Sequence, residues 1–259
     1  SKGNLSTQEQ EFLKRDTFFG NEKTPLGYVM GVMNMILHGI DSPNVYRQNT
    51  LTENIRDIQE KERHNIILAN PPFGGKEKSQ VQQNFPVQSG ATEILFMQHF
   101  MKMLKLDGKA SIVVPEGVLF QGNNAFKQVK QELLENFNVH TILSLPTGVF
   151  LPYSGVKTNI IYFDRKGATS DIWYYELEPP YKLTKNKPIQ YEHFKEFLEL
   201  YESRKETDNS WLVKVEDIKD YDISAKNPNT EQEAELLPPK EILQAIRTND
   251  KELGELINN

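Results

Sequence analysis

Between residues 17 and 163 the chain alternates short apolar runs with amphipathic stretches. This alternation is typical of α/β folds, in which helices join the strands of a largely parallel sheet. It predicts a sheet of about six or seven strands. The apolar runs that predict these strands are Thr17–Phe19, Ile66–Ala69, Ala110–Val114, Val139–Leu145, Val156–Phe163 and, at the edge of the sheet, Ile172–Tyr175.

Capping signals mark the first helix. Thr24 and Pro25 supply an N-cap residue and a first-turn proline, and His38-Gly39 supplies a cation and a glycine that end a helix. Thr92 can cap a later helix that continues to about Lys105. Just before that helix, residues 74–90 are polar and flanked by glycines, so we expect a mobile loop there.

The composition excludes several classes of protein. Of the 259 residues, 37% are hydrophobic and 25% are charged, as in ordinary globular proteins. The absence of cysteine excludes disulfides and a thiol nucleophile, and favours the reducing cytoplasm. No apolar run approaches the roughly 18 residues of a membrane helix, and the five histidines lack metal-ligand spacing. The net charge of −6 means that binding to DNA requires a partner or a local basic patch.

The tetrapeptide Asn70-Pro71-Pro72-Phe73 directly follows a predicted strand. The carboxyl end of a strand is where open α/β sheets bind ligands. An amine attached to a heterocycle is planar and a poor nucleophile, because its lone pair is delocalised into the ring. Two acceptors aimed at its N–H groups, the Asn70 side-chain oxygen and the Pro71 carbonyl, would favour a pyramidal nitrogen that can attack.

The rest of the tetrapeptide suits the same chemistry. Pro71 and Pro72 restrict the backbone, so the acceptors are held in place before a substrate arrives. Phe73 offers a flat face on which a base can stack. Because an amine inside a duplex is out of reach, the base must first rotate out of the helix. The motif therefore predicts chemistry on adenine or cytosine; the alternative is a plain strand-ending turn, which Asn-Pro also initiates.

With the motif and its surroundings together, the chain resembles the modification (methyltransferase) subunit of type I restriction-modification systems, a family of N6-adenine DNA methyltransferases. The likeness is strong over about residues 17–165 and weak beyond. The segments that carry it are Phe18–Glu22, Met33–Ile40, Leu68–Gly75, Gly108–Ala110, Leu145–Phe150 and Gly155–Asn159.

This resemblance implies a cofactor, partners and further site residues. Asn70, Pro71, Pro72 and Phe73 correspond to the catalytic loop, and the methyl donor is S-adenosylmethionine. Glu22 corresponds to the acid that accepts the ribose hydroxyls of the cofactor, as a carboxylate at a strand end commonly does. Asn49 stands where the family usually has an Asp that contacts the cofactor adenine. The implied partners are DNA and the specificity and restriction subunits of the same system.

The resemblance also defines the expected fold and its divisions. The family's first strand and glycine-rich turn should precede residue 17, but the sequence there lacks them and no G-x-G occurs in the chain. We therefore expect an N-terminally truncated, Rossmann-like α/β methyltransferase sheet that lacks its first strand and binds its cofactor weakly on its own. The predicted divisions are residues 1–165 as a partial catalytic domain, 166–221 as its C-terminal extension, and 222–259 as a linker and partner-docking helix.

Two other functions remain open at this point. A protein glutamine methyltransferase of the same fold also uses Asn-Pro-Pro-aromatic, on an amide, although the segments after residue 145 and the docking helix argue against it. A catalytically silent structural module of a larger assembly is the second alternative. The missing glycine-rich turn favours this second alternative, and the intact motif at residues 70–73 disfavours it.

Overall fold

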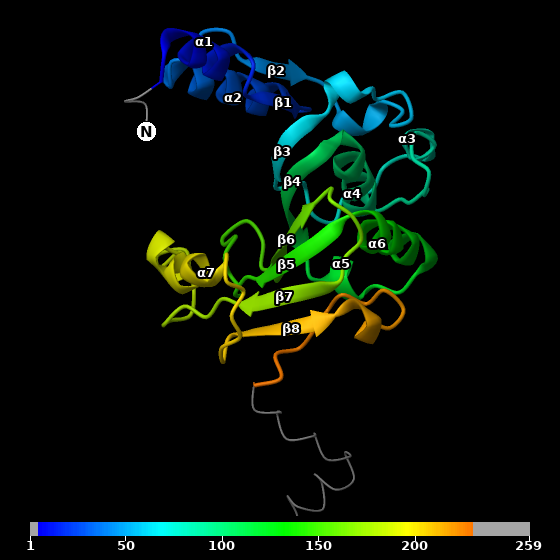
Figure 1. Ribbon diagram of the computed structural model, residues 1–259. Coiled ribbons are helices and arrows are strands. Elements are labelled where there is room, and N and C mark those ends of the chain that lie inside the picture. The colour runs from blue at the N-terminus through cyan, green and yellow to red at the C-terminus, as the bar shows by residue number, and fades with distance from the viewer. Residues whose placement is uncertain (1–4, 230–259) are drawn as a thin grey trace, which may run out of the picture.

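The computed structural model describes residues 5–229. Figure 1 shows a small N-terminal unit above a larger α/β unit that is built on a six-stranded sheet. The small unit contains α1 (Thr7–Arg15), β1 (Phe19–Glu22), α2 (Pro25–Leu37) and β2 (Asn44–Arg47). Its two strands pair in parallel and form a sheet of their own.

The predicted ends of α2 are confirmed. Thr24 is the N-cap, and its hydroxyl oxygen accepts a hydrogen bond from the Gly27 N–H at 3.3 Å, while Pro25 is the first helical residue. His38 is the C-cap, and Gly39 follows with a φ of +84°, a backbone conformation that favours glycine. The strand before the helix was placed about two residues too early by the sequence pattern, because β1 extends to Glu22.

The large sheet has the strand order β3-β4-β6-β5-β7-β8. Its strands are β3 (His64–Ala69), β4 (Leu104–Pro115), β5 (Asn138–Ser144), β6 (Thr158–Asp164), β7 (Asp171–Glu176) and β8 (Ser210–Lys214). β3 pairs with β4, and β5 with β7, in parallel, whereas β6 is antiparallel to both neighbours and β8 to β7. The expectation of a largely parallel sheet was therefore wrong, since a segment without a helix joins β5 to β6 and such connections produce antiparallel pairs.

The position predicted for Ile172–Tyr175 was also wrong. This segment lies within β7, which has a neighbour on each side, and β8 forms the edge instead. Trp173, Tyr174 and Tyr175 are buried, so these aromatics are packing residues of the core. The sequence pattern missed β8, a strand of only five residues.

Helices cover both faces of the large sheet (Figure 1). On one face α4 (Thr92–Met103), α5 (Gly117–Phe120) and α6 (Asn124–Asn136) bury residues such as Val129 and Leu133 in the main core. On the other face, Phe197 of α7 (Lys195–Leu200) packs against Trp173 and Tyr175. The remaining short helices are α3 (Ser79–Gln82), η2 (Thr50–Thr52), η3 (Glu60–Glu62), η4 (Tyr191–Phe194) and η5 (Val215–Asp217).

Residues 74–90 form a folded segment. They include α3, and the side chain of Phe85 is buried in a small core with Leu51, Ile55 and Leu95. The segment is therefore not irregular throughout, because the buried Phe85 packs it against the rest of the unit, and its mobility stays a prediction.

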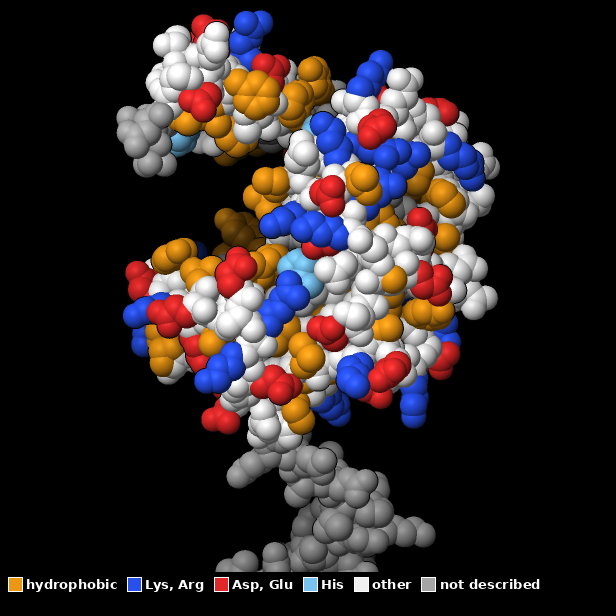
Figure 2. Space-filling model, viewed as in Figure 1, with side chains coloured by type: hydrophobic (Ala, Val, Ile, Leu, Met, Phe, Trp, Pro, Cys, Tyr) orange, Lys and Arg blue, Asp and Glu red, His pale blue; other side chains and the backbone are white. Residues whose placement is uncertain are grey.

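The β3 edge of the large sheet has no partner strand among the described residues. Ile66 and Leu68 are 67% and 79% exposed, on the face opposite Ile67, which packs into the main core. The sequence predicted a buried strand here. Figure 2 shows a hollow between the N-terminal unit and the large unit, with hydrophobic side chains at its margin. The proposed domain divisions stay a prediction, and the partner-docking helix expected toward the end of the 222–259 segment lies outside the described residues.

Candidate functional site

The Asn70–Phe73 tetrapeptide leaves the carboxyl end of β3. Pro71 is buried, whereas Asn70 is exposed. Among the described residues, neither the Asn70 side chain nor the Pro71 carbonyl takes part in a hydrogen bond. Both acceptors at this strand end therefore lack a hydrogen-bond partner within the described chain.

The N-terminus of α4 holds the backbone that follows the tetrapeptide. The Gly74 N–H donates to the Glu93 carboxylate at 2.5 Å, and the Thr92 N–H donates to the Gly75 carbonyl at 3.2 Å. Thr92 was expected to cap α4, but it is the first helical residue, and its hydroxyl donates to the same Gly75 carbonyl at 3.3 Å. A Cβ atom at residue 75 would lie 2.7 Å from the Thr92 Oγ1 atom, so glycine is required for this close approach.

Phe73 has an aromatic neighbour that sequence reasoning did not single out. The rings of Phe73 and Phe150 meet edge to face, with their centroids 5.6 Å apart and their planes at 72°. Phe150 belongs to the segment between β5 and β6, 77 positions further along the chain. The sequence feature that could have identified Phe150 is its position in Leu145–Phe150, one of the segments on which the family resemblance rests.

Glu22 and Asn49 lie close together in the N-terminal unit. Glu22 ends β1, and its carbonyl accepts a hydrogen bond from the Gln48 N–H at 3.1 Å, one residue before Asn49. Because β1 and β2 are parallel, both predicted cofactor residues lie at the carboxyl edge of this sheet.

The Glu22 carboxylate is bound on one side only. Its Oε1 atom accepts hydrogen bonds from the N–H and the hydroxyl of Thr24, each at 2.7 Å. The backbone donor first and then the hydroxyl lower the pKa of Glu22, which keeps it ionised. No hydrogen bond from a described residue reaches Oε2. At Asn49, Oδ1 accepts from the Leu51 N–H at 3.2 Å, whereas no described residue accepts from its Nδ2 group.

Two contacts join the N-terminal unit to β3 and to the segment that follows the Asn70–Phe73 tetrapeptide. Lys23 Nζ lies 3.7 Å from the Oε1 atom of Glu77, four residues beyond Phe73. At the other end of the strands, the rings of Phe19 and His64 are 5.3 Å apart. The first contact joins the residue after Glu22 to the segment after the tetrapeptide, so the carboxyl ends of β1 and β3 face the same side of the molecule.

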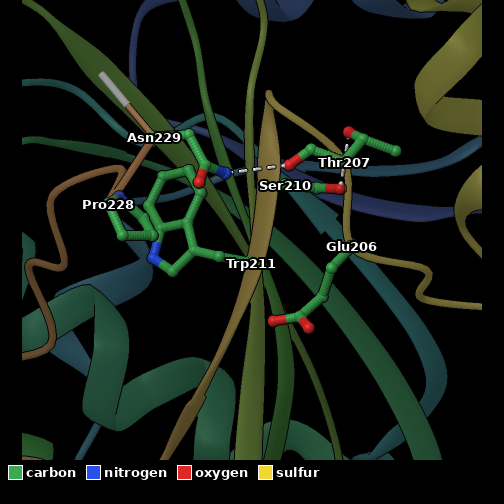
Figure 3. A pocket seen from close by; sticks show the side chains of 6 residues that line it. All are labelled: Glu206, Thr207, Ser210, Trp211, Pro228 and Asn229. Atoms are coloured by element: carbon green, nitrogen blue, oxygen red, sulfur yellow. Dashed lines mark hydrogen bonds between the residues drawn. The ribbon is translucent and has the colours of Figure 1, made fainter. Parts of the chain in front are cut away.

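Two cavities in the described part lie away from the predicted site residues. One cavity of about 270 Å³ lies at β8 and is lined by Glu206, Thr207, Ser210, Trp211, Pro228 and Asn229 (Figure 3). A second, of about 420 Å³, lies between the ends of α4 and α6. Residues 5–229 contain no group of three or more Asp, Glu or His side chains that could hold a metal ion. Within the same range, no helix is both long enough and apolar enough to span a bilayer.

Comparison with known proteins settles the family. The family model described as N-6 DNA Methylase matches residues 3–236. This chain belongs to the N-6 DNA methylase family. Among curated members, the methylase subunit of the EcoEI type I restriction enzyme of Escherichia coli is 34% identical over 269 residues, covering 98% of this chain and 54% of that protein. The EcoKI methylase subunit of Escherichia coli K12 is 30% identical over 248 residues, covering 88% of this chain and 46% of that protein.

Solved structures of the family agree in fold. One, from work on complex assembly and conformational transition of a type I restriction-modification system, has a TM-score of 0.84 and 44% identity, and the match covers 99% of this chain and 56% of that chain. The EcoKI M protein has a TM-score of 0.66 and 30% identity, covering 76% of this chain and 43% of that chain. The chain thus spans about half the length of the curated relatives it matches.

Proposed function

We propose that this chain forms part of the catalytic core of an adenine-specific DNA methyltransferase, the modification subunit of a type I restriction-modification system. The single observation that carries the proposal is the pair of free acceptors at Asn70 and Pro71 next to the edge-to-face rings of Phe73 and Phe150. Such an arrangement suits a flat heterocycle that bears an amine. In the assembled complex, the specificity subunit recognises the DNA sequence and the restriction subunit cleaves the DNA. Because its substrate is DNA, the complex would act in the cytoplasm.

The two acceptors act on the adenine N6 amine. The Asn70 side-chain oxygen accepts one N–H and the Pro71 carbonyl accepts the other. Both acceptors are neutral and fixed by the flanking prolines, so they favour the pyramidal nitrogen whose lone pair is free to attack. As the new bond forms, the nitrogen loses a proton to solvent or to a neighbouring acceptor. No covalent enzyme intermediate is needed.

The aromatic pair orients the base. Phe73 stacks on one face of the flipped adenine, and Phe150, perpendicular to Phe73, limits the pocket at its side. An aromatic platform also offsets part of the free energy of unstacking the base from the duplex. A side-chain amide has no ring to stack, so this geometry favours a base over the glutamine of a protein substrate.

The residues at the carboxyl edge of β1 and β2 fit part of S-adenosylmethionine. Glu22 is ionised and keeps Oε2 free to accept the ribose hydroxyls, and Asn49 keeps Nδ2 free to donate to the cofactor adenine. The described residues include no glycine-rich turn for the methionine portion. When bound, the cofactor supplies an electrophilic methyl group.

Identification of the methyl acceptor tests this proposal. The complete subunit, assembled with its specificity subunit, is incubated with labelled S-adenosylmethionine, duplex DNA and a glutamine-bearing protein mixture, and the labelled product is hydrolysed and analysed. We expect label in N6-methyladenine. Label in cytosine or glutamine would contradict the proposal, and no label in any acceptor would favour the silent structural module.

A further inference from the structure

We propose that Tyr153 is a DNA-contacting side chain that enters the duplex beside the target adenine and occupies the space that the flipped base leaves. The inference rests on the proposed function and adds a residue to it. The ring of Tyr153 is 94% exposed, in the same β5–β6 segment that places Phe150 against Phe73. No hydrogen bond to its hydroxyl exists among the described residues.

The turn that carries both rings is tight. The Phe150 carbonyl accepts hydrogen bonds from the Tyr153 N–H at 2.8 Å and from the Ser154 N–H at 3.0 Å. The Ser154 hydroxyl then accepts from the Val156 N–H at 3.2 Å. Because the Tyr153 N–H is hydrogen-bonded to the Phe150 carbonyl, the turn fixes the position of Tyr153 relative to the proposed base pocket.

The first stem of the segment is anchored at Gly148. This residue has a φ of +90°, and a Cβ atom there would lie 3.3 Å from the Leu183 carbonyl oxygen and 3.1 Å from the Leu151 side chain. The Leu151 N–H also donates to the Gly148 carbonyl at 3.2 Å. Glycine thus lets the segment pack closely against the chain ahead of α7.

The second stem is anchored at Lys157. Its Nζ atom lies 3.3 Å from the Glu116 carboxylate and 3.8 Å from the Glu176 carboxylate, and its carbonyl accepts the Glu116 N–H at 2.9 Å. Glu116 follows β4 and Glu176 ends β7, so the ends of three strands converge on this stem. With both stems fixed, the turn presents Tyr153 on a rigid support.

A rigid, exposed tyrosine next to a base pocket suits a stacking role. Its ring has only two side-chain torsions, so binding costs little conformational entropy, and stacking on bases is tolerant of sequence. Stacking that does not depend on the base sequence suits this subunit, because the specificity subunit is proposed to recognise the DNA sequence. Side chains inserted between base steps stabilise unstacked DNA in the same way. Leu151 and Val156, which are also exposed, extend the apolar tip.

The test measures base flipping and DNA affinity in the complete subunit with its specificity subunit, with 2-aminopurine at the target position as the fluorescent probe. The variants are Tyr153→Ala, the conservative Tyr153→Trp, and Leu212→Ala as a control at an exposed apolar position on β8. We expect Tyr153→Ala to lower the DNA affinity about tenfold. The rise in 2-aminopurine fluorescence that accompanies binding should become smaller by a similar factor. Tyr153→Trp and the control should match wild type, and all variants should keep the wild-type unfolding temperature.

A second substrate separates insertion from mere contact. DNA in which the target lies opposite an abasic site has no base pair to break and leaves no orphaned partner base for Tyr153 to stabilise, so we expect it to restore flipping by Tyr153→Ala. If wild type methylates adenine and flips the probe but Tyr153→Ala does both equally well, the inference fails while the proposed function stands. If wild type neither flips nor methylates, the proposed function fails first.

Discussion

Phe73 and Phe150 meet edge to face with their ring centroids 5.6 Å apart, although 77 positions separate them in the chain. One ring belongs to the Asn70–Phe73 tetrapeptide and the other to the segment between β5 and β6. The contact joins two connections at the same edge of the sheet, and in the proposed function it forms one corner of the pocket for the base.

This contact predicts that Phe150 contributes to base binding as Phe73 does. We expect Phe150→Ala and Phe73→Ala each to lower adenine methylation by about 5- to 150-fold, because each removes roughly 1 to 3 kcal/mol of stacking or orientation. The double variant should lose less than the product of the two single effects, since the rings act together. Strictly multiplicative losses in methylation assays would indicate that the rings act on separate steps.

The approach of Gly75 to Thr92 predicts a sensitive position in a solvent-exposed segment. Gly75→Ala places a Cβ atom 2.7 Å from Thr92 Oγ1 and 2.8 Å from Thr92 Cγ2, so the catalytic loop or α4 must shift. We expect a loss of about 1 to 3 kcal/mol in the free energy of unfolding, measured by urea denaturation. Thr92→Ala in the same chain removes both atoms and should recover most of the loss. No recovery would place the strain elsewhere.

Much of the fold follows from the sequence because local signals and tertiary packing agree there. The start of α2 at Thr24-Pro25 and the strand before Asn70 are examples. A capping residue and an apolar run can each be recognised from a few neighbouring residues. The pairing direction of β6 and the position of β7 inside the sheet were predicted wrongly, because strand neighbours depend on contacts between distant segments. The contact of Phe150 with Phe73 was missed for the same reason. The tetrapeptide itself could be found because all of its residues are consecutive in the sequence.

Burial of His99 predicts acid sensitivity. Burial, and to a smaller extent the charge of His64, lowers the pKa of His99 from 6.5 to about 4. The unfolded chain binds a proton at His99 below about pH 6.5, whereas the folded chain does so only near pH 4, so the free energy of unfolding falls as the pH decreases through this window. The full effect is of order 3 kcal/mol at its lower end.

A variant without the titrating group checks this effect. Denaturation of wild type and His99→Leu at neutral pH and at about pH 5 should give a flatter pH profile for the variant. Burial also lowers the pKa of His140 to about 4, so the variant should retain part of the acid sensitivity. Identical slopes for the two proteins would show that His99 is already protonated in the folded chain or is not the group involved.

The cofactor residues predict weak binding by the chain of 259 residues alone. We propose that Glu22 and Asn49 hold the nucleoside portion, and the described residues offer no glycine-rich turn for the methionine portion. In a calorimetric titration with S-adenosylmethionine we expect little or no heat from this chain and clear binding by the complete subunit. Glu22→Gln in the complete subunit should weaken binding about tenfold, through loss of a charged acceptor. Tight binding by the chain alone would contradict this account.

The central claim is that Asn70 activates the amine of a flipped adenine. The most direct test is transfer of labelled methyl to duplex DNA by the complete subunit with its specificity subunit, comparing wild type with Asn70→Ala. Asn70 is exposed and makes no hydrogen bond within the described chain, so the variant should fold and bind DNA normally. The account predicts labelled N6-methyladenine with wild type and at least a 100-fold slower reaction with the variant, about the cost of removing one aligned polar group. Equal rates for the two proteins would contradict it.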